Sequence, residues 1–122
     1  MILVVDDHAD TCRLLVHFLG KEGLSSTAAH SGEAALQLMR ESVPSMIVLD
    51  DFMPGMSGLE VIRELRKDPK YEDVPIIFYS GKEDVARREE ALRLGATAWL
   101  EKAKTPMPEI VARIKFLMPE DG

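Results

Sequence analysis

The sequence predicts an α/β domain with a doubly wound, five-stranded parallel sheet and five helices on its two faces. Short apolar segments bounded by turn residues recur along the chain, which is typical of buried parallel strands. Amphipathic segments separate them, and the connections between the two are short. Right-handed crossovers in such a strand–helix repeat place helices on both faces of the sheet. The length of 122 residues fits one domain, which we expect to span residues 1–122 with no output domain.

The first strand and helix are predicted from the N-terminal segment. Residues 2–5 form a continuous run of Ile, Leu and Val, and two adjacent carboxylates, Asp6 and Asp7, follow it. The apolar i, i+3/i+4 stripe that comes next predicts a helix ending near residues 20–23. Cys12 lies on this stripe, so we expect it to be a small core residue.

A more polar segment at residues 25–29 suits a strand at the edge of the sheet. Ser31 is the expected N-cap of the next helix, which ends before Pro44. The third strand, residues 46–49, is wholly apolar and runs directly into Asp50. Because ligands of open α/β sheets bind beyond the carboxyl ends of the strands, we expect Asp50 at the binding edge.

The second half of the chain continues the alternation. A helix is predicted after Gly58, and further strands at residues 74–79 and 97–100. The helix between those strands, residues 83–94, has a narrow apolar stripe, so it either packs lightly and serves a partner or is a solvated helix. The last helix is expected to begin with Thr105 as its N-cap, and a short tail follows it. The polar second strand and the short fifth strand make natural edges, which predicts the strand order 2-1-3-4-5.

Polar side chains end four of the predicted strands. Asp6 and Asp7 follow the first strand, Asp50 the third, Ser80 the fourth and Lys102 the fifth. Carboxylates crowded into a partly desolvated pocket repel one another, so they require a cation. Hard oxygen ligands with room for water suit Mg²⁺, or Mn²⁺, better than Zn²⁺. A phosphoryl group that contacts the metal, the hydroxyl and the ammonium would balance the charges of the set.

These residues resemble a known family. Asp6-Asp7, Asp50-x-x-Met53-Pro54-x-x-x-Gly58, Ser80-Gly81 and Lys102 match, in order and at similar spacing, the receiver domains of bacterial two-component response regulators. The resemblance covers essentially the whole chain. It implies the CheY-like, flavodoxin-like strand order given above, and a signalling switch in a phosphorelay rather than an enzyme.

The resemblance also implies how the acidic residues act. Asp50 would be the phosphoacceptor, taking the phosphoryl group from a phosphohistidine of a sensor histidine kinase or a phosphotransfer protein. Asp7, Asp50 and the backbone carbonyl of Phe52 would ligate Mg²⁺. Asp6 would position the metal or its waters.

The remaining site residues would read the phosphoryl group. Ser80 would donate a hydrogen bond to a phosphoryl oxygen, and Lys102 would form an ion pair with it. In the family's switch the hydroxyl moves toward the phosphate and an aromatic side chain on the fifth strand turns inward; this position is Trp99. A downstream protein or a detached effector domain would recognise the change at residues 83–118.

Three departures from the family pattern bear on function. Trp99 is larger than the usual Tyr or Phe, so it either switches with hindrance or simply covers the edge strand. Ala103 replaces the Pro that usually follows the lysine in a cis peptide, and we expect a trans bond because a non-proline cis bond costs ~2.5–4 kcal/mol. Phe52 and Lys82 occupy the two positions that tune loss of the phosphate. Neither orients an attacking water, so we expect slow hydrolysis.

Composition restricts the partners and the compartment. The net charge of −6 argues against direct binding of nucleic acid or an anionic membrane surface. No apolar run approaches the ~20 residues that span a bilayer. The single Cys12 excludes an internal disulfide. We expect a cytoplasmic protein that is a monomer or a phosphorylation-dependent dimer.

Three alternatives stay open. A metal-dependent phosphohydrolase with an aspartyl nucleophile would need a second acid two residues after Asp50, where Phe52 stands. A receiver-like interaction module whose phosphorylation has lapsed would tolerate Trp99 and Ala103. A flavin-binding protein of similar topology would need a phosphate loop after the first strand, which the sequence lacks.

Overall fold

The computed structural model describes residues 1–119, and in that range five parallel strands form one sheet in the order β2-β1-β3-β4-β5. The predicted fold class and strand order are confirmed. The strands are β1 (Ile2–Val5), β2 (Ser26–Ala29), β3 (Met46–Leu49), β4 (Ile76–Ser80) and β5 (Ala98–Glu101). Because the chain crosses from β2 over β1 to β3, the order reverses between β1 and β3, where both strands end in aspartates.

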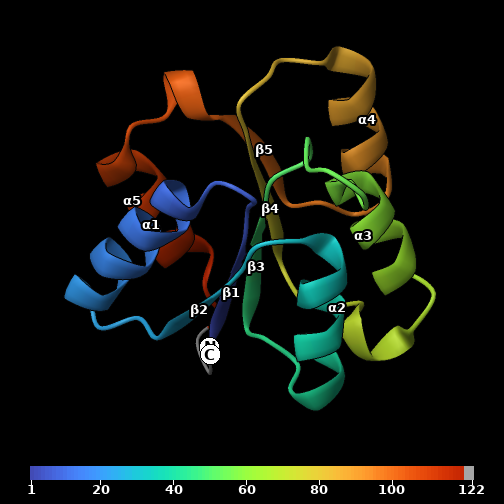
Figure 1. Cartoon of the computed structure of the whole chain (residues 1–122), viewed down its shortest axis with the longest axis horizontal. Coiled ribbons are helices and arrows are strands. Elements are labelled where there is room, and N and C mark those ends of the chain that lie inside the picture. Colours follow the sequence, from blue (N-terminus) through green and yellow to red (C-terminus); the bar gives the residue numbers. More distant parts are fainter. Residues whose placement is uncertain (120–122) are drawn as a thin grey trace.

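The helices form two layers around the sheet. Figure 1 shows α1 and α5 on one face and α2, α3 and α4 on the other. Their bounds are α1 (Ala9–Lys21), α2 (Gly32–Glu41), α3 (Gly58–Leu65), α4 (Val85–Arg93) and α5 (Met107–Leu117), and two 3₁₀ segments cover Pro69–Tyr71 and Lys102–Lys104. No helix in residues 1–119 is long and apolar enough to cross a membrane.

Alternation along the strands divides the core into two clusters. Leu3 and Val5 pack beneath α2, α3 and α4, whereas Ile2 and Val4 pack beneath α1 and α5. Successive side chains of a strand point to opposite faces, so a central strand must be apolar at every position. Cys12 is buried in the second cluster, which confirms that it is a core residue.

The start of α3 approaches the end of β3 closely because Gly58 has no side chain. A Cβ atom added at Gly58 would lie 2.5 Å from the carbonyl oxygen of Asp50. The helix then begins with a capping box, in which the Ser57 side chain accepts from the backbone of Glu60 and the Glu60 side chain accepts from the backbone of Ser57. Both features fix the backbone next to the end of β3.

Helix α4 has little apolar contact with the rest of the domain, which fits both interpretations of its narrow apolar stripe. Ala91 is its buried residue. Polar contacts hold its C-terminal end, where the Arg66 guanidinium donates to the carbonyls of Leu94 and Gly95 at 2.7 and 3.1 Å. A helix attached in this way shifts at a lower free-energy cost than one with a buried apolar face.

Several predicted boundaries differ from the structure. β2 and β5 each begin one residue later than predicted, and α4 spans Val85–Arg93 rather than residues 83–94. β4 begins at Ile76 rather than residue 74, because Pro75 has no N–H to donate to the ladder, and it includes Ser80. Thr105 was wrongly predicted to cap the last helix. Pro106 occupies the N-cap position, and Thr105 is buried at the end of the Lys102–Lys104 turn. The predicted tail lies mostly beyond the described residues.

Candidate functional site

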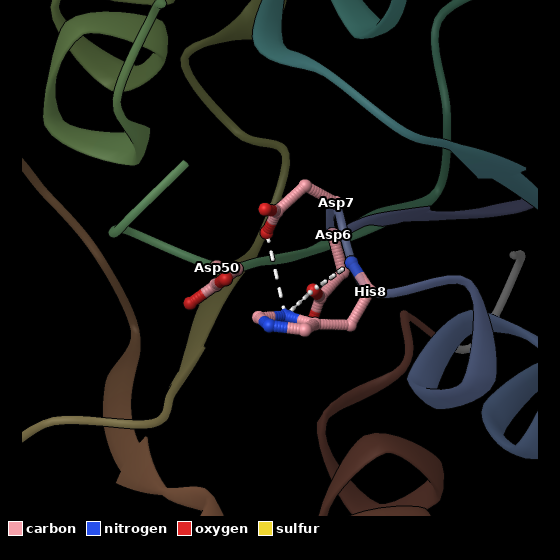
Figure 2. A group of neighbouring side chains, drawn as sticks. All are labelled: Asp6, Asp7, His8 and Asp50. Atoms are coloured by element: carbon pink, nitrogen blue, oxygen red, sulfur yellow. Dashed lines mark hydrogen bonds and ion pairs between the residues drawn. The ribbon is translucent and has the colours of Figure 1, made fainter. Parts of the chain in front are cut away.

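Three aspartates and a histidine meet where β1 and β3 end. Asp6, Asp7, His8 and Asp50 each offer one ligand atom, and these atoms lie within 4.8 Å of one another (Figure 2). His8 Nδ1 is 3.0 Å from Asp6 Oδ1 and 3.3 Å from Asp7 Oδ1. We did not predict His8 as a member of this cluster from the sequence. Its position directly after the aspartate pair was the available signal.

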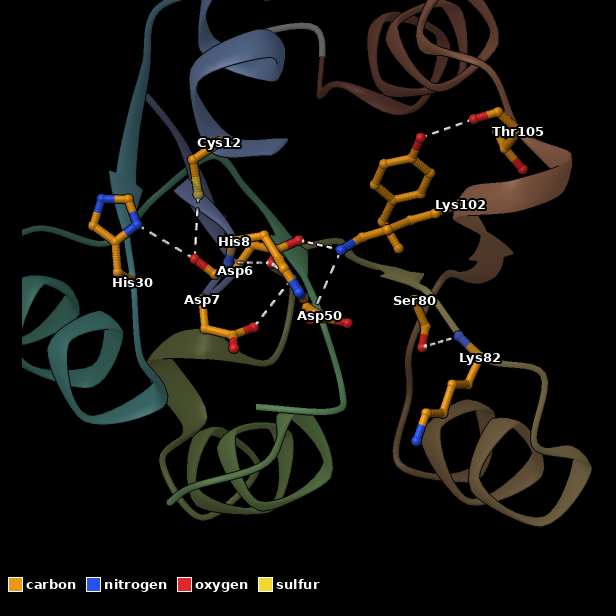
Figure 3. Close-up of polar contacts among 11 residues, drawn as sticks. Asp6, Asp7, His8, Cys12, His30, Asp50, Ser80, Lys82, Lys102 and Thr105 are labelled. Carbon is orange, nitrogen blue, oxygen red and sulfur yellow. Dashed lines mark hydrogen bonds and ion pairs between the residues drawn. The ribbon is translucent and has the colours of Figure 1, made fainter. Parts of the chain in front are cut away.

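Lys102 reaches the same cluster from the end of β5. Its Nζ atom lies 2.6 Å from Asp6 Oδ2 and 3.8 Å from Asp50 Oδ2 (Figure 3). Asp6 and Asp50 are both buried, so the ammonium is a close countercharge for two carboxylates that water barely reaches. The structure therefore brings together the first, third and fifth strand ends, as the topology requires.

The charges and burial around Asp50 favour a bound cation. Burial, and then the neighbouring charge of Asp6, raise the pKa of Asp50 from 3.8 to about 6, although Lys102 opposes the shift. Within the described residues, the buried Oδ1 atom of Asp50 has no hydrogen-bond partner, and Asp7 Oδ1 has no hydrogen bond beyond the 3.3 Å ion-pair contact with His8. Buried carboxylate oxygens without donors are costly, and a hard divalent cation satisfies them. The donor set thus fits Mg²⁺ or Mn²⁺.

Ser80 lies at the end of β4, fully buried and paired in register with Glu101, the residue before Lys102. Its Oγ atom accepts a hydrogen bond from the backbone N–H of Lys82 at 3.3 Å (Figure 3). The hydroxyl proton is free of this contact and can be donated elsewhere.

The two positions expected to tune phosphate loss contact each other. The Lys82 Nζ atom lies 5.0 Å from the centre of the Phe52 ring, and Arg87 Cζ lies 5.4 Å from the same centre. These are cation–π distances. A ring flanked by two cations offers no acceptor that could orient a water molecule for hydrolysis.

Asp51 has a function that we did not predict from the sequence. Its side chain is fully buried, and Oδ1 accepts a hydrogen bond from the backbone of Leu59 in the first turn of α3 at 3.1 Å. Both carboxylate oxygens also pair with Arg87 of α4, Oδ2 with Nε and Oδ1 with Nη2 at 2.9 Å. This hydrogen bond raises the pKa of Arg87. The residue next to Asp50 thus links two helices.

Trp99 lies beside Phe78 of β4, its partner in the strand register. Its ring stacks on Phe78 with centroids 5.1 Å apart and an angle of 16° between the planes. The side chain is partly buried against the cluster beneath α2, α3 and α4. Its Nε1 atom is buried without a hydrogen-bond partner among residues 1–119. The stack therefore joins neighbouring residues of β4 and β5, and a role of Trp99 in switching stays a prediction.

The turn after Lys102 has ordinary peptide geometry. No cis peptide bond occurs in the described part of the chain, and Lys102–Lys104 form a 3₁₀ turn. Lys102 reaches the acidic cluster from this turn even though Ala103 stands where the family usually has Pro.

The chain is similar in sequence to proteins of one known family. The model of the response regulator receiver domain family matches residues 2–115. The transcriptional activator protein ExaE of Pseudomonas putida is 39% identical over 107 residues, which is 86% of this chain and 49% of ExaE. The chain spans about half the length of the curated relatives it matches.

Solved structures show the same fold. The chemotaxis response regulator CheY4 of Vibrio cholerae superposes with a TM-score of 0.87 at 25% identity, covering 96% of this chain and 97% of CheY4. The response regulator TrrA of Thermotoga maritima, solved in complex with Mg²⁺ and BeF, gives a TM-score of 0.83 at 32% identity, covering 96% of this chain and 97% of TrrA.

Proposed function

This chain belongs to the response regulator receiver domain family, and on that premise we propose that it is a phosphoacceptor switch in which Asp50 receives the phosphoryl group. One observation supports this assignment above the others. Asp50 is 3% exposed, yet its Oδ1 atom lacks a hydrogen-bond partner in residues 1–119, and Lys102 lies beside its other oxygen. A buried carboxylate in this setting is arranged for a reaction rather than for stability.

In the proposed reaction, a carboxylate oxygen of Asp50 attacks the phosphorus of a phosphohistidine on a sensor kinase or phosphotransfer protein. The new O–P bond forms while the P–N bond breaks, and the electron pair leaves with the histidine nitrogen, which then takes a proton. The raised pKa makes Asp50 a stronger base than an exposed aspartate while it stays mostly ionised at neutral pH. Lys102 and Ser80 would then hold phosphoryl oxygens by an ion pair and a hydrogen bond.

Asp6, Asp7, Asp50 and the backbone carbonyl of Phe52 would hold Mg²⁺ or Mn²⁺. When bound, the ion would neutralise the carboxylates and the oxygens of the incoming phosphoryl group. The Mg²⁺ and BeF of TrrA support this assignment by similarity. His8 already contacts two of the carboxylates, so it would either turn away or coordinate.

The output would be read at residues 83–118, which include α4, β5 and α5. The weak apolar attachment of α4 supports a role in signalling. The relatives' names point to transcriptional regulation, so the reader would be an effector domain of the same protein or a separate protein, with no direct contact between this domain and nucleic acid. A cytoplasmic location stays a prediction.

Incubation with acetyl phosphate and Mg²⁺, followed by mass spectrometry, tests the proposal. The parent should gain one phosphate and Asp50→Asn none. Asp51→Asn is the matched control, because it alters the adjacent carboxylate and should still gain the phosphate. Absence of an adduct in the parent would favour a module whose phosphorylation has lapsed, and steady release of free phosphate from many esters would favour a phosphohydrolase.

A further inference from the structure

Lys102 depends on a turn that has little intrinsic rigidity. The turn Lys102–Lys104 leaves the sheet at the end of β5 and leads to Thr105 before α5 begins. Ala103, at its centre, has no ring to lock its backbone torsion as a proline would. Because the Lys102 side chain is long, a small shift of that backbone becomes a larger displacement of the Nζ atom. This atom must stay near Asp50.

Consecutive residues of β4 hold both ends of this turn. At the entry, Ser80 pairs in register with Glu101, the last residue of β5. At the exit, the Tyr79 hydroxyl donates a hydrogen bond to the carbonyl oxygen of Thr105 at 2.8 Å, the contact that ends on Thr105 in Figure 3. Lys102 lies between the two attachments.

The hydrogen bond at the exit is buried. Tyr79 is 5% exposed and Thr105 is 4% exposed. Burial of both partners makes loss of the donor costly, because the Thr105 carbonyl would be left without water or a replacement. The Tyr79 ring packs in the cluster beneath α1 and α5, so the hydroxyl is held by a rigid body.

We propose that Tyr79 is a positioning residue for the phosphoryl site: its hydroxyl fixes the exit of the Lys102–Lys104 turn and thereby keeps the Lys102 ammonium beside Asp50. The expected effect on phosphoryl binding rests on the proposed function, in which Lys102 pairs with the phosphoryl oxygens. Tyr79 itself does not contact the reacting atoms.

The chain contains a matched control for this hydroxyl. Tyr71 is 6% exposed, and its hydroxyl donates to the backbone carbonyl of Met39 at 3.0 Å. The Met39 carbonyl belongs to α2, on the opposite face of the sheet from the Lys102 turn. Tyr79→Phe and Tyr71→Phe therefore remove the same kind of buried bond, and only the first should alter the phosphoryl site.

The experiment measures binding of beryllofluoride, a phosphoryl mimic, by calorimetry at saturating Mg²⁺, and binding of Mg²⁺ alone. Tyr79→Phe should weaken beryllofluoride binding about three- to tenfold, the range expected for one hydrogen bond. Mg²⁺ affinity should change less than about twofold, because the aspartates stay in place. Tyr71→Phe should leave both affinities unchanged. In a Lys102→Met background, Tyr79→Phe should have no further effect on beryllofluoride.

A second measurement does not depend on phosphoryl chemistry. Acetylation of lysines, followed by mass spectrometry, reports how firmly Lys102 is paired in the free protein. Tyr79→Phe should raise the labelling rate of Lys102 relative to Tyr71→Phe, with other lysines unchanged.

Equal labelling of Lys102 in the two variants, or an undiminished effect of Tyr79→Phe in the Lys102→Met background, would overturn the proposal. Failure of the parent to bind beryllofluoride would contradict the proposed function instead, and the labelling rates would still decide the role of Tyr79.

Discussion

The pair between Asp51 and Arg87 offers the sharpest test of how the phosphoacceptor loop is connected to α4. Arg87→Gln removes the guanidinium and leaves a carboxylate that is fully buried, with the Leu59 N–H as its remaining described side-chain contact. Asp51→Asn instead removes the negative charge. The asparagine can still accept from Leu59, and Arg87, whose side chain is 32% exposed, can turn toward water.

The two changes should therefore differ in cost. Removing one partner of a fully buried ion pair costs about 3–5 kcal/mol, and the partial exposure of Arg87 reduces this to about 2–4 kcal/mol for Arg87→Gln. Asp51→Asn should cost about 1–2 kcal/mol, since no buried charge is left unpaired. The double variant should be less destabilised than Arg87→Gln alone, because it removes the stranded charge.

Urea unfolding at neutral pH measures these free energies of unfolding, with unchanged slopes as the check that only stability has altered. Arg88→Gln is the control on the same helix turn and should stay within about 0.5 kcal/mol of the parent. The coupling would be refuted if the losses of unfolding free energy in the two single variants added up in the double variant. It would also be refuted if Arg87→Gln lost no more stability than Arg88→Gln.

Three further predictions follow from the site and its loop. Folding raises the pKa of Asp50 from 3.8 to about 6, so the folded state binds the proton more tightly, and this contribution to stability is lost as pH rises through that window. In metal-free buffer, Asp50→Asn should therefore gain stability over the parent as pH rises from about 4 to about 7, by up to about 3 kcal/mol in thermal unfolding. The phosphorylated form should hydrolyse slowly, because Phe52 and Lys82 offer no group to orient water, and Phe52→Asn should shorten the lifetime of the label once phosphodonor is removed. Gly58→Ala should cost more than about 2 kcal/mol, because its Cβ would overlap the Asp50 carbonyl, while Gly20→Ala, with no atom near, should stabilise α1 by up to about 1 kcal/mol.

Each of these has an outcome that would count against it. A stability difference between Asp50→Asn and the parent that does not vary with pH would contradict the raised pKa. A half-life of seconds for the parent's phosphate would contradict slow hydrolysis. Equal melting temperatures for the Gly58 and Gly20 variants would show that the loop relaxes freely around an added methyl group.

The strands and the acidic edge could be predicted because they depend on local pattern. Because β3 is apolar at every position, it must be a central strand covered on both faces. The residue that follows it then lies at the carboxyl edge of the sheet. The polar character of β2 likewise marked it as an edge strand, and the observed order agrees. Such features require no knowledge of distant contacts.

The contacts that the sequence did not reveal join residues far apart in the chain. Asp51 and Arg87 are 36 residues apart, and Tyr79 and Thr105 are 26 apart, so their pairing depends on how helices and turns pack. Thr105 illustrates the difficulty. Its type and the following Pro suggested a helix cap, but the 3₁₀ turn before it buries the residue and its carbonyl accepts from β4.

Mapping the acceptor atom tests the central claim most directly. After treatment with acetyl phosphate and Mg²⁺, borohydride reduces an aspartyl phosphate to homoserine, and peptide mass spectrometry locates the altered residue. We predict homoserine at position 50 alone, and none when Mg²⁺ is removed by a chelator. Homoserine at position 6, 7 or 51, or a phosphate that resists borohydride because it sits on another side chain, would contradict the assignment of Asp50.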